Sequence, residues 1–210
     1  PACLTHFGTT PRGPSPHWTA FPPGLITLNL NGHERVLEEI STFPPSLRKL
    51  TLGGFSMKVN VVTMLSALPR TLTELNLPTT IVQDREEAAA LPPNLTRFTA
   101  MSGPLHAVMH GYLPCTLESL VTGVFNDSNL MRFTQLRTLT ATKQLEFTVR
   151  DRIAVERLLV PPTLTQLTLN LLIFDLDDLS ALGNTLTELN IRTLHKLQGN
   201  VFAQAPRSLR

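Results

Sequence analysis

The 210-residue sequence has few cysteines, few aromatic residues and few charges. Its two cysteines, Cys3 and Cys115, cannot form a disulfide framework, and no CxxC pair indicates structural zinc. Charged residues make up 16% of the chain, and the formal net charge of +2 is too small to indicate nucleic-acid binding. No apolar run approaches the roughly 18 residues of a membrane span. With 42% hydrophobic residues, the chain is expected to fold.

A repeated pattern runs through most of the sequence. A proline-containing segment precedes a leucine, and hydrophobic residues follow three and five positions later, as in residues 43–52 (FPPSLRKLTL). We name the leucine that follows the proline segment the anchor leucine. The anchor leucines lie 19 to 28 residues apart, with a mean of 23, at Leu25, Leu47, Leu72, Leu95, Leu117, Leu136, Leu164, Leu186 and Leu209. Such a period predicts a fold built from stacked repeats.

The LxxLxL core of each copy is typical of a strand that buries one face. The hydrophobic residues three and five positions after the anchor leucine point to the same side, and their neighbours point to the other. One strand cannot bury these leucines alone, so neighbouring copies must stack in parallel. Proline lacks an N–H group and fixes φ, so the chain enters each strand extended and at a defined place. The pattern therefore predicts a curved ladder of eight parallel strands.

This pattern resembles the leucine-rich-repeat family, whose repeats of about 20–29 residues share the LxxLxL core. The resemblance runs from residue 21 to the end. It implies an α/β repeat solenoid shaped as a horseshoe, with a parallel β-sheet on the concave face and short helices or loops on the convex face. Residues 52–55 (LGGF) and 122–126 (TGVFN) are more similar to FNIP-type repeats. The asparagine ladder of the wider family is missing, so we expect the turn after each strand to differ.

The chain is expected to have two parts. Residues 1–20 form a segment rich in proline and glycine, and residues 21–210 form the solenoid of about eight repeats and a truncated ninth. Between the strands, helix-forming residues predict short helices over 84–91, 150–159 and 175–182, and a weaker one over 60–68. Neither end carries a polar capping repeat, so we expect the sequence to be part of a longer chain.

The alternation within each strand also predicts the concave surface. The residues four positions after the anchor leucines form a neutral column, mainly Thr and Asn. The residues two positions after them form a mixed column, in which Lys49, Glu74 and Arg97 alternate in charge on neighbouring strands. For single residues we favour cross-strand pairing worth a few tenths of a kcal/mol. For the whole face we favour partner binding, because an exposed parallel sheet is unusual. The candidate partner-binding residues are Lys49, Glu74, Arg97, Glu188 and Arg192.

Few residue patterns suggest metal binding. His106 and His110 are four residues apart, but Ala107 stands where a zincin requires glutamate. Cys3 and His6 have ligand spacing without a second pair. We therefore predict no metal.

Other chemical motifs are equally weak. The acidic residues at 175–178 lack the glycine and closing glutamate of a calcium loop, so they favour a helix start. Of the two glycosylation sequons, at Asn94 and Asn126, the first lies against an anchor leucine, which leaves only the second as a credible site in a secreted chain. No phosphate-binding glycine loop or nucleophile elbow is present. We predict that the chain is not an enzyme and needs no cofactor.

We therefore expect a non-enzymatic scaffold that binds a protein partner through its concave face, without nucleic acid and without a membrane span. Three alternatives stay open. They are a recognition module of a larger enzyme such as a ubiquitin ligase or kinase, an extracellular receptor or surface antigen, and a structural subunit of a large assembly. We expect a cytoplasmic location, with an extracellular one left open. The sequence indicates neither the partner nor the oligomeric state.

Overall fold

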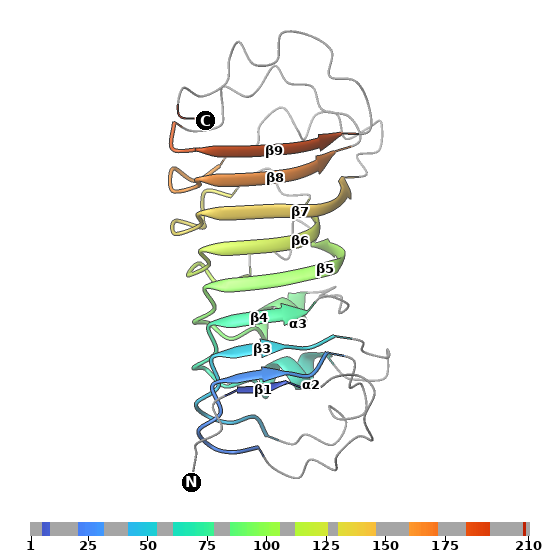
Figure 1. The fold of residues 1–210 in the computed structure, drawn as a ribbon, viewed down its shortest axis with the longest axis vertical. Helices are drawn as coiled ribbons and strands as arrows, with labels where there is room; N and C mark the ends of the chain where they lie inside the picture. The colour runs from blue at the N-terminus through green and yellow to red at the C-terminus, as the bar shows by residue number, and fades with distance from the viewer. Residues whose placement is uncertain are drawn as a thin grey trace.

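A computed structural model of the protein describes residues 6–8, 21–31, 42–53, 61–77, 85–105, 112–125, 130–145, 160–171, 184–193 and 208. Its strands form one parallel sheet in sequence order (Figure 1). They are β1 (His6–Gly8), β2 (Thr27–Asn29), β3 (Lys49–Thr51), β4 (Glu74–Leu77), β5 (Arg97–Leu105), β6 (Ser119–Phe125), β7 (Thr138–Leu145), β8 (Gln166–Leu171) and β9 (Glu188–Thr193). Two short helices are described, α2 (Val61–Ser66) and α3 (Arg85–Ala89).

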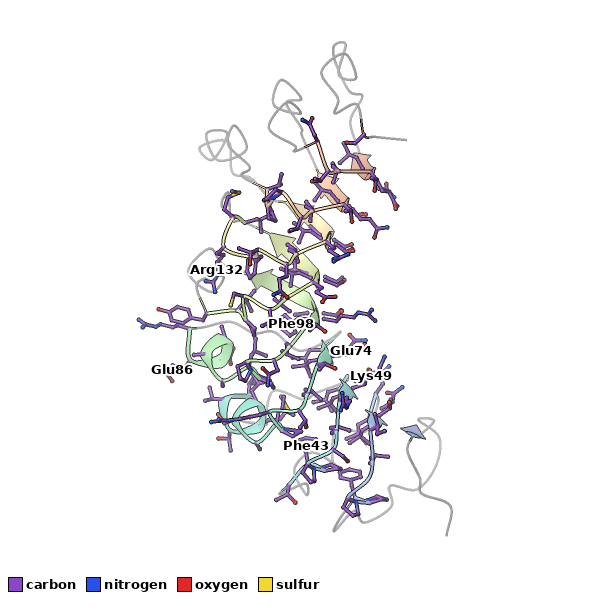
Figure 2. The ribbon with its side chains drawn as sticks, turned by 90° about the vertical axis from the view of Figure 1, so that its left-hand side faces the viewer. Phe43, Lys49, Glu74, Glu86, Phe98 and Arg132 are labelled. Atoms are coloured by element: carbon purple, nitrogen blue, oxygen red, sulfur yellow. The ribbon has the colours of Figure 1, made fainter. Side chains whose placement is uncertain are left out.

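The strand register follows the repeat. Strands β2 to β9 each begin two residues after an anchor leucine, and equivalent positions are paired throughout, as in Lys49 with Glu74 and Glu74 with Arg97. Seen from the side, the strands lie along the inner curve of an arc, and α2 and α3 lie on its outer side (Figure 2). The predicted solenoid, with a parallel sheet on the concave face and short helices on the convex face, is confirmed.

A β-turn precedes the strands β2 to β8 and explains the prolines. The backbone N–H of Leu47 donates to the carbonyl oxygen of Pro44 at 3.1 Å, which closes a turn of four residues with Pro45 at its second position. The same bond joins Leu25 to Pro22 and Leu164 to Pro161. Proline favours the second position of a type I or II turn because its φ is already near −65°. The strands with a proline in this turn, β2 to β6 and β8, therefore start at a fixed distance from it, and the turn before β7 closes in the same way without proline, from Leu136 N–H to the carbonyl oxygen of Phe133.

Hydroxyl groups connect consecutive turns in a ladder that we name the hydroxyl ladder. Its donors occupy the position before the anchor leucine, and each donates to the carbonyl oxygen of the anchor leucine one repeat earlier. The donors are Ser46, Thr71, Thr116, Thr163, Thr185 and Ser208, and their distances are 2.6–3.1 Å. Asn94 occupies the same position in its repeat and donates instead to the carbonyl oxygen of Arg70, at 2.9 Å. These bonds satisfy carbonyl groups that the β-ladder does not reach.

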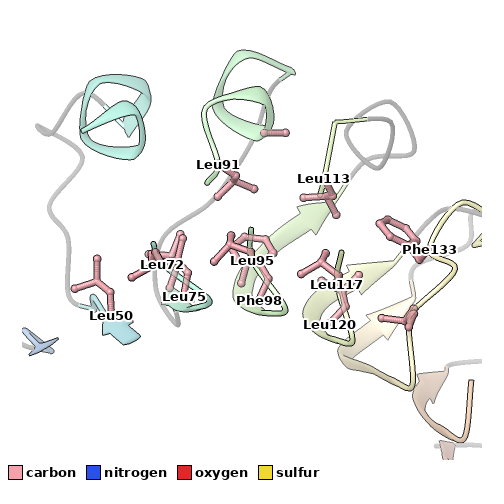
Figure 3. Close-up of a cluster of buried hydrophobic side chains, with 14 of the residues drawn as sticks. Leu50, Leu72, Leu75, Leu91, Leu95, Phe98, Leu113, Leu117, Leu120 and Phe133 are labelled. Atoms are coloured by element: carbon pink, nitrogen blue, oxygen red, sulfur yellow. The ribbon is translucent and has the colours of Figure 1, made fainter. Parts of the chain in front are cut away.

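The core lies between the sheet and the convex side (Figure 3). The described anchor leucines, and the leucines three residues after them except Leu189, are almost fully buried in rows along the solenoid. Two aromatic residues, Phe98 and Phe133, are buried among them. In the central repeats the position five residues after the anchor is small, with Ala100, Thr122 and Ala141 all buried. The central core therefore combines large and small side chains where the outer repeats use leucine.

Two of the four predicted convex helices lie in described residues, and both are present. The weaker prediction over 60–68 corresponds to α2, and the prediction over 84–91 corresponds to α3. Both helices pack apolar side chains against the core: Met64 and Leu65 of α2 and Ala88 of α3 are buried. The helices predicted over 150–159 and 175–182 lie outside the described residues.

The sheet begins earlier than the sequence predicted. Strand β1 lies within the segment 1–20, which we had separated from the repeats, and it pairs in parallel with β2. The register places His6 beside Thr27 and Phe7 beside Leu28, so this strand occupies the same position as a repeat strand. Phe7 stands where most copies have leucine, and the Pro-Pro signal is absent before it. The boundary at residue 21 therefore marks the first clear repeat and not the start of the sheet.

Candidate functional site on the concave face

The concave face is made of side chains that alternate with the buried leucines. In strands β2 to β9, the residues two and four positions after the anchor leucine are half-buried or exposed, whereas the residue three positions after it is buried in all strands except β9. In β9 the residue at that position, Leu189, is partly buried. No described element covers this face, although parallel sheets are usually buried on both sides. The strands therefore hold two columns of side chains, all polar except Val121, in a fixed register toward solvent.

Three charged residues converge near one end of this face. Lys49 Nζ lies 2.9 Å from Oε1 of Glu74, and Nη1 of Arg97 lies 3.1 Å from the same oxygen. The side chains come from β3, β4 and β5, and Figure 2 shows Lys49 and Glu74 on the concave side, opposite Glu86. Their exposed fractions are 50% for Lys49, 28% for Glu74 and 62% for Arg97. We name these three residues the charged triad.

A second network lies toward the other end, and it contains only one charge. Thr138 donates its hydroxyl to Oε1 of Gln166 at 3.1 Å, and Nε2 of Gln166 donates to Oε2 of Glu188 at 3.1 Å. These residues lie on β7, β8 and β9. Ser119, on β6, separates this network from the charged triad. The column two residues after the anchor leucines is thus divided into a charged half and a nearly neutral half.

The neighbouring column, four residues after the anchor leucines, is uncharged. Thr51, Asn76 and Thr99 lie side by side on β3, β4 and β5 and are half-buried. Oδ1 of Asn76 is shielded from solvent and has no hydrogen-bond partner among the described residues. An unsatisfied buried acceptor destabilises a fold by about 1–3 kcal/mol. This amide lies two residues from Glu74 on the same face of β4, next to the charged triad.

The structure brings together three of the five predicted partner-binding residues. Lys49, Glu74 and Arg97 form the charged triad. Glu188 lies at the far end of the sheet and accepts the bond from Gln166. Arg192 lies on β9 beside Asn170, and its side chain lies outside the described part of the structure. The sequence reasoning missed the hydrogen bonds of Thr138 and Gln166, although both occupy the same column as four of the five candidates.

Most of the other residues that the sequence singled out are not placed by the structure. His106, His110, Cys3 and the acidic residues at 175–178 lie outside the described residues, as does the sequon at Asn126. Cys115 is exposed and unpaired. Within the described ranges, no group of three His, Cys, Asp or Glu residues could hold a metal ion, and no helix is long and apolar enough to cross a membrane.

The sequon at Asn94 is tied into the fold. Its side-chain amide donates to Arg70, and the Thr96 hydroxyl donates to the carbonyl oxygen of Thr73 at 3.3 Å. Both polar groups that a glycosylation reaction would use are therefore engaged between repeats.

No protein-family model and no curated protein matches the sequence. Solved structures do resemble the fold. LegL7, a leucine-rich repeat-containing protein from Legionella pneumophila, matches with a TM-score of 0.51 and 18% identity over 92% of this chain and 74% of its own. CroV588, a circular leucine-rich-repeat protein, matches with a TM-score of 0.52 and 22% identity over 90% of this chain and 27% of its own. An internalin from Listeria monocytogenes matches with a TM-score of 0.49 and 19% identity over 90% of this chain and 60% of its own.

At these identities the likeness concerns the fold alone, and the chain spans only 60% of the internalin and 27% of CroV588. The register, the buried leucine rows and the matches to LegL7 and CroV588 agree with one another. The chain is folded as a leucine-rich-repeat solenoid.

Proposed function

We propose that this chain is a non-enzymatic interaction module that binds a protein partner through its concave face. The observation that carries the proposal is the open parallel sheet, whose two polar columns face solvent in strict register. A rigid repeat array presents such a surface without ordering loops on binding, so less conformational entropy opposes association. The leucine-rich-repeat fold is generally a protein-binding module, which supports the same function.

Finer features of the proposal rest on sequence. The FNIP-type assignment is supported by the Pro-Pro-x-Leu-x-x-Leu-x-Leu copies and by the glycine and phenylalanine that follow the core pattern in two copies, in residues 52–55 and 122–126. A cytoplasmic location is supported by the exposed, unpaired thiol of Cys115, since extracellular proteins usually pair their cysteines. The partner itself is left to experiment.

The test compares substitutions on the two faces. Thr140, half-buried on β7, points to the concave face, and Ala89, exposed on α3, belongs to the convex side. Arginine at position 140 adds a long charged side chain to the proposed interface, whereas arginine at 89 adds the same group elsewhere. Tagged wild-type protein, Thr140→Arg and Ala89→Arg are purified from the native cells, and the partners are identified by mass spectrometry.

We expect wild-type protein and Ala89→Arg to retain a stoichiometric protein partner that Thr140→Arg loses. Circular dichroism and thermal unfolding establish that both variants are folded before the comparison. If Thr140→Arg retains the same partner as wild-type protein, the concave face is not the binding surface.

A further inference from the structure

Among the described side chains on and just before the strands, most cations lie on the β3 to β5 side of the sheet. On β2 to β5 and the residue before each strand, the described side chains include three cations, Arg48, Lys49 and Arg97, and one carboxylate, Glu74. On β6 to β9 and the residues before them, the described side chains include one cation, Arg137, and two carboxylates. The described side chains of β2 to β5 and of the residues before these strands therefore carry a net positive charge, which is complementary to an acidic ligand.

The geometry of the charged triad concentrates this excess at one point. The strands that carry Lys49 and Arg97 are separated by β4, yet both cationic groups reach one oxygen, Oε1 of Glu74. No described residue donates to the other oxygen, Oε2. One carboxylate thus holds two cations close together, and both remain at least half exposed. An incoming carboxylate could contact both cations from the solvent side.

The existing ion pairs are weak enough to be rearranged. Exposed pairs of this kind contribute only about 0.2–1 kcal/mol because water screens the charges and the long side chains lose freedom. A partner carboxylate that shares Lys49 and Arg97 with Glu74 would also lie in a site with less water, where charge-assisted hydrogen bonds are stronger. The arginine can supply two parallel donors to such a group.

Asn76 provides a second and independent observation. Its Oδ1 lacks a hydrogen-bond donor and lies on the same face of β4 as Glu74. A peptide that places a carboxylate on the charged triad would carry backbone N–H groups over this column. Rotation of the Asn76 amide toward such a donor would satisfy the oxygen on binding. Thr51 and Thr99, on both sides of Asn76, are uncharged, so this column adds no charge that would repel an acidic peptide.

We propose that the partner binds the concave face with an acidic peptide segment laid across β3, β4 and β5, one of whose carboxylates sits between Lys49 and Arg97. This inference rests on the proposed function and names the chemistry of the partner. It assigns Lys49 and Arg97 as the contact residues, Glu74 as the group that holds them together and competes with the ligand, and Asn76 as an acceptor for the peptide backbone.

The test measures binding of a fluorescein-labelled peptide of alternating Glu and Ser by fluorescence anisotropy. Matched peptides of Gln and Ser and of Lys and Ser serve as neutral and basic controls. We expect the acidic peptide to bind with an affinity that falls as the salt concentration is raised. We expect the neutral and basic peptides not to bind. The double variant Lys49→Gln/Arg97→Gln is expected to bind it about tenfold or more weakly.

Two further variants separate this inference from a general charge effect. The double variant Arg70→Gln/Arg85→Gln removes the same charge from exposed positions outside the sheet, and it is expected to bind like wild-type protein. Glu74→Gln removes the competing carboxylate, so it is expected to bind the acidic peptide more tightly. If the Lys49→Gln/Arg97→Gln variant proves unfolded, the rise in affinity of Glu74→Gln still tests the inference.

Three outcomes would overturn the inference. They are equal binding of the acidic and neutral peptides, equal weakening by both double variants, and unchanged or weaker binding by Glu74→Gln. Labelled single-stranded poly(U) RNA is measured in parallel. If it binds more tightly than the peptide and loses affinity in the same variant, the occupant is a nucleic-acid phosphate and not a peptide. If peptide binding fails while Thr140→Arg still loses the native partner, the inference is wrong and the proposed function stands.

Discussion

The hydroxyl of Thr116 donates to the carbonyl oxygen of Leu95, one repeat earlier, at 2.7 Å. It also lies 3.1 Å from the carbonyl oxygen of Pro93. The threonine precedes one anchor leucine, and its acceptor is the anchor leucine of the previous repeat. One side chain therefore fixes the distance between two consecutive turns, and the relationship recurs along the solenoid as the hydroxyl ladder.

Substitution of this hydroxyl tests the ladder. Thr116→Val keeps the shape of the side chain but removes the hydroxyl donor. The carbonyl oxygens of Pro93 and Leu95 then lose this hydrogen bond. We expect the free energy of unfolding to fall by about 1–3 kcal/mol, measured by urea denaturation. Thr116→Ser keeps the donor, as Ser46 does in its own repeat, and should retain most of the stability. Equal losses in the two variants would show that the methyl group matters and not the hydrogen bond.

The small residues of the central core give a second prediction. Ala141 is fully buried in a position where the first three repeats have leucine. Leucine at this position would make the repeat more regular, but the surrounding core has already filled the space. We expect Ala141→Leu to lower the free energy of unfolding by about 1–3 kcal/mol. A more stable variant in the same denaturation experiment would mean that the central core is loosely packed.

The charged triad is expected to contribute little to stability. In a double-mutant cycle with Lys49→Ala and Glu74→Ala, we expect a coupling energy of about 1 kcal/mol or less, because both groups are partly exposed. The coupling should decrease in high salt. A coupling of several kcal/mol that is insensitive to salt would show that the triad is a structural element, and it would weaken its assignment to binding.

Substitution of Asn76 by threonine is expected to raise the stability of the fold. Threonine is common in its column, as Thr51 and Thr99 show, and it has a high preference for strands. Asn76→Thr also removes the unsatisfied oxygen, so we expect the free energy of unfolding to rise by up to about 1–3 kcal/mol. The same variant should bind the acidic peptide less tightly, as expected when a functional residue is kept at the expense of stability. A loss of stability would place Asn76 among the structural residues.

The strand positions could be predicted because the pattern repeats. Each copy places its leucines at the same offsets, so one alignment of the copies gave the start of every strand from β2 to β9. It also gave the two surface columns, since side chains alternate along a strand. The pairing of Lys49 with Glu74 and of Glu74 with Arg97 followed from that register alone.

Features that vary between copies could not be predicted. Strand β1 has Phe7 in place of leucine and lacks the proline signal. The longer strands β5 and β7 shift register after Ala100 and after Ala141, beyond the shared core positions. The donors of the hydroxyl ladder were visible as Ser or Thr before six of the nine anchor leucines, but each acceptor lies in another repeat, a contact that only the stacked structure shows.

The central claim, that a protein partner contacts the concave face, is tested most directly by site-specific photo-crosslinking. A benzophenone side chain is introduced at Thr140 on the concave face and, in a second protein, at Ala89 on α3. Each is irradiated in the native cells, and the adducts are mapped by mass spectrometry. The account predicts a specific protein adduct at position 140 that is absent at position 89. An adduct at 89 with none at 140 would contradict it and place the partner on the convex side.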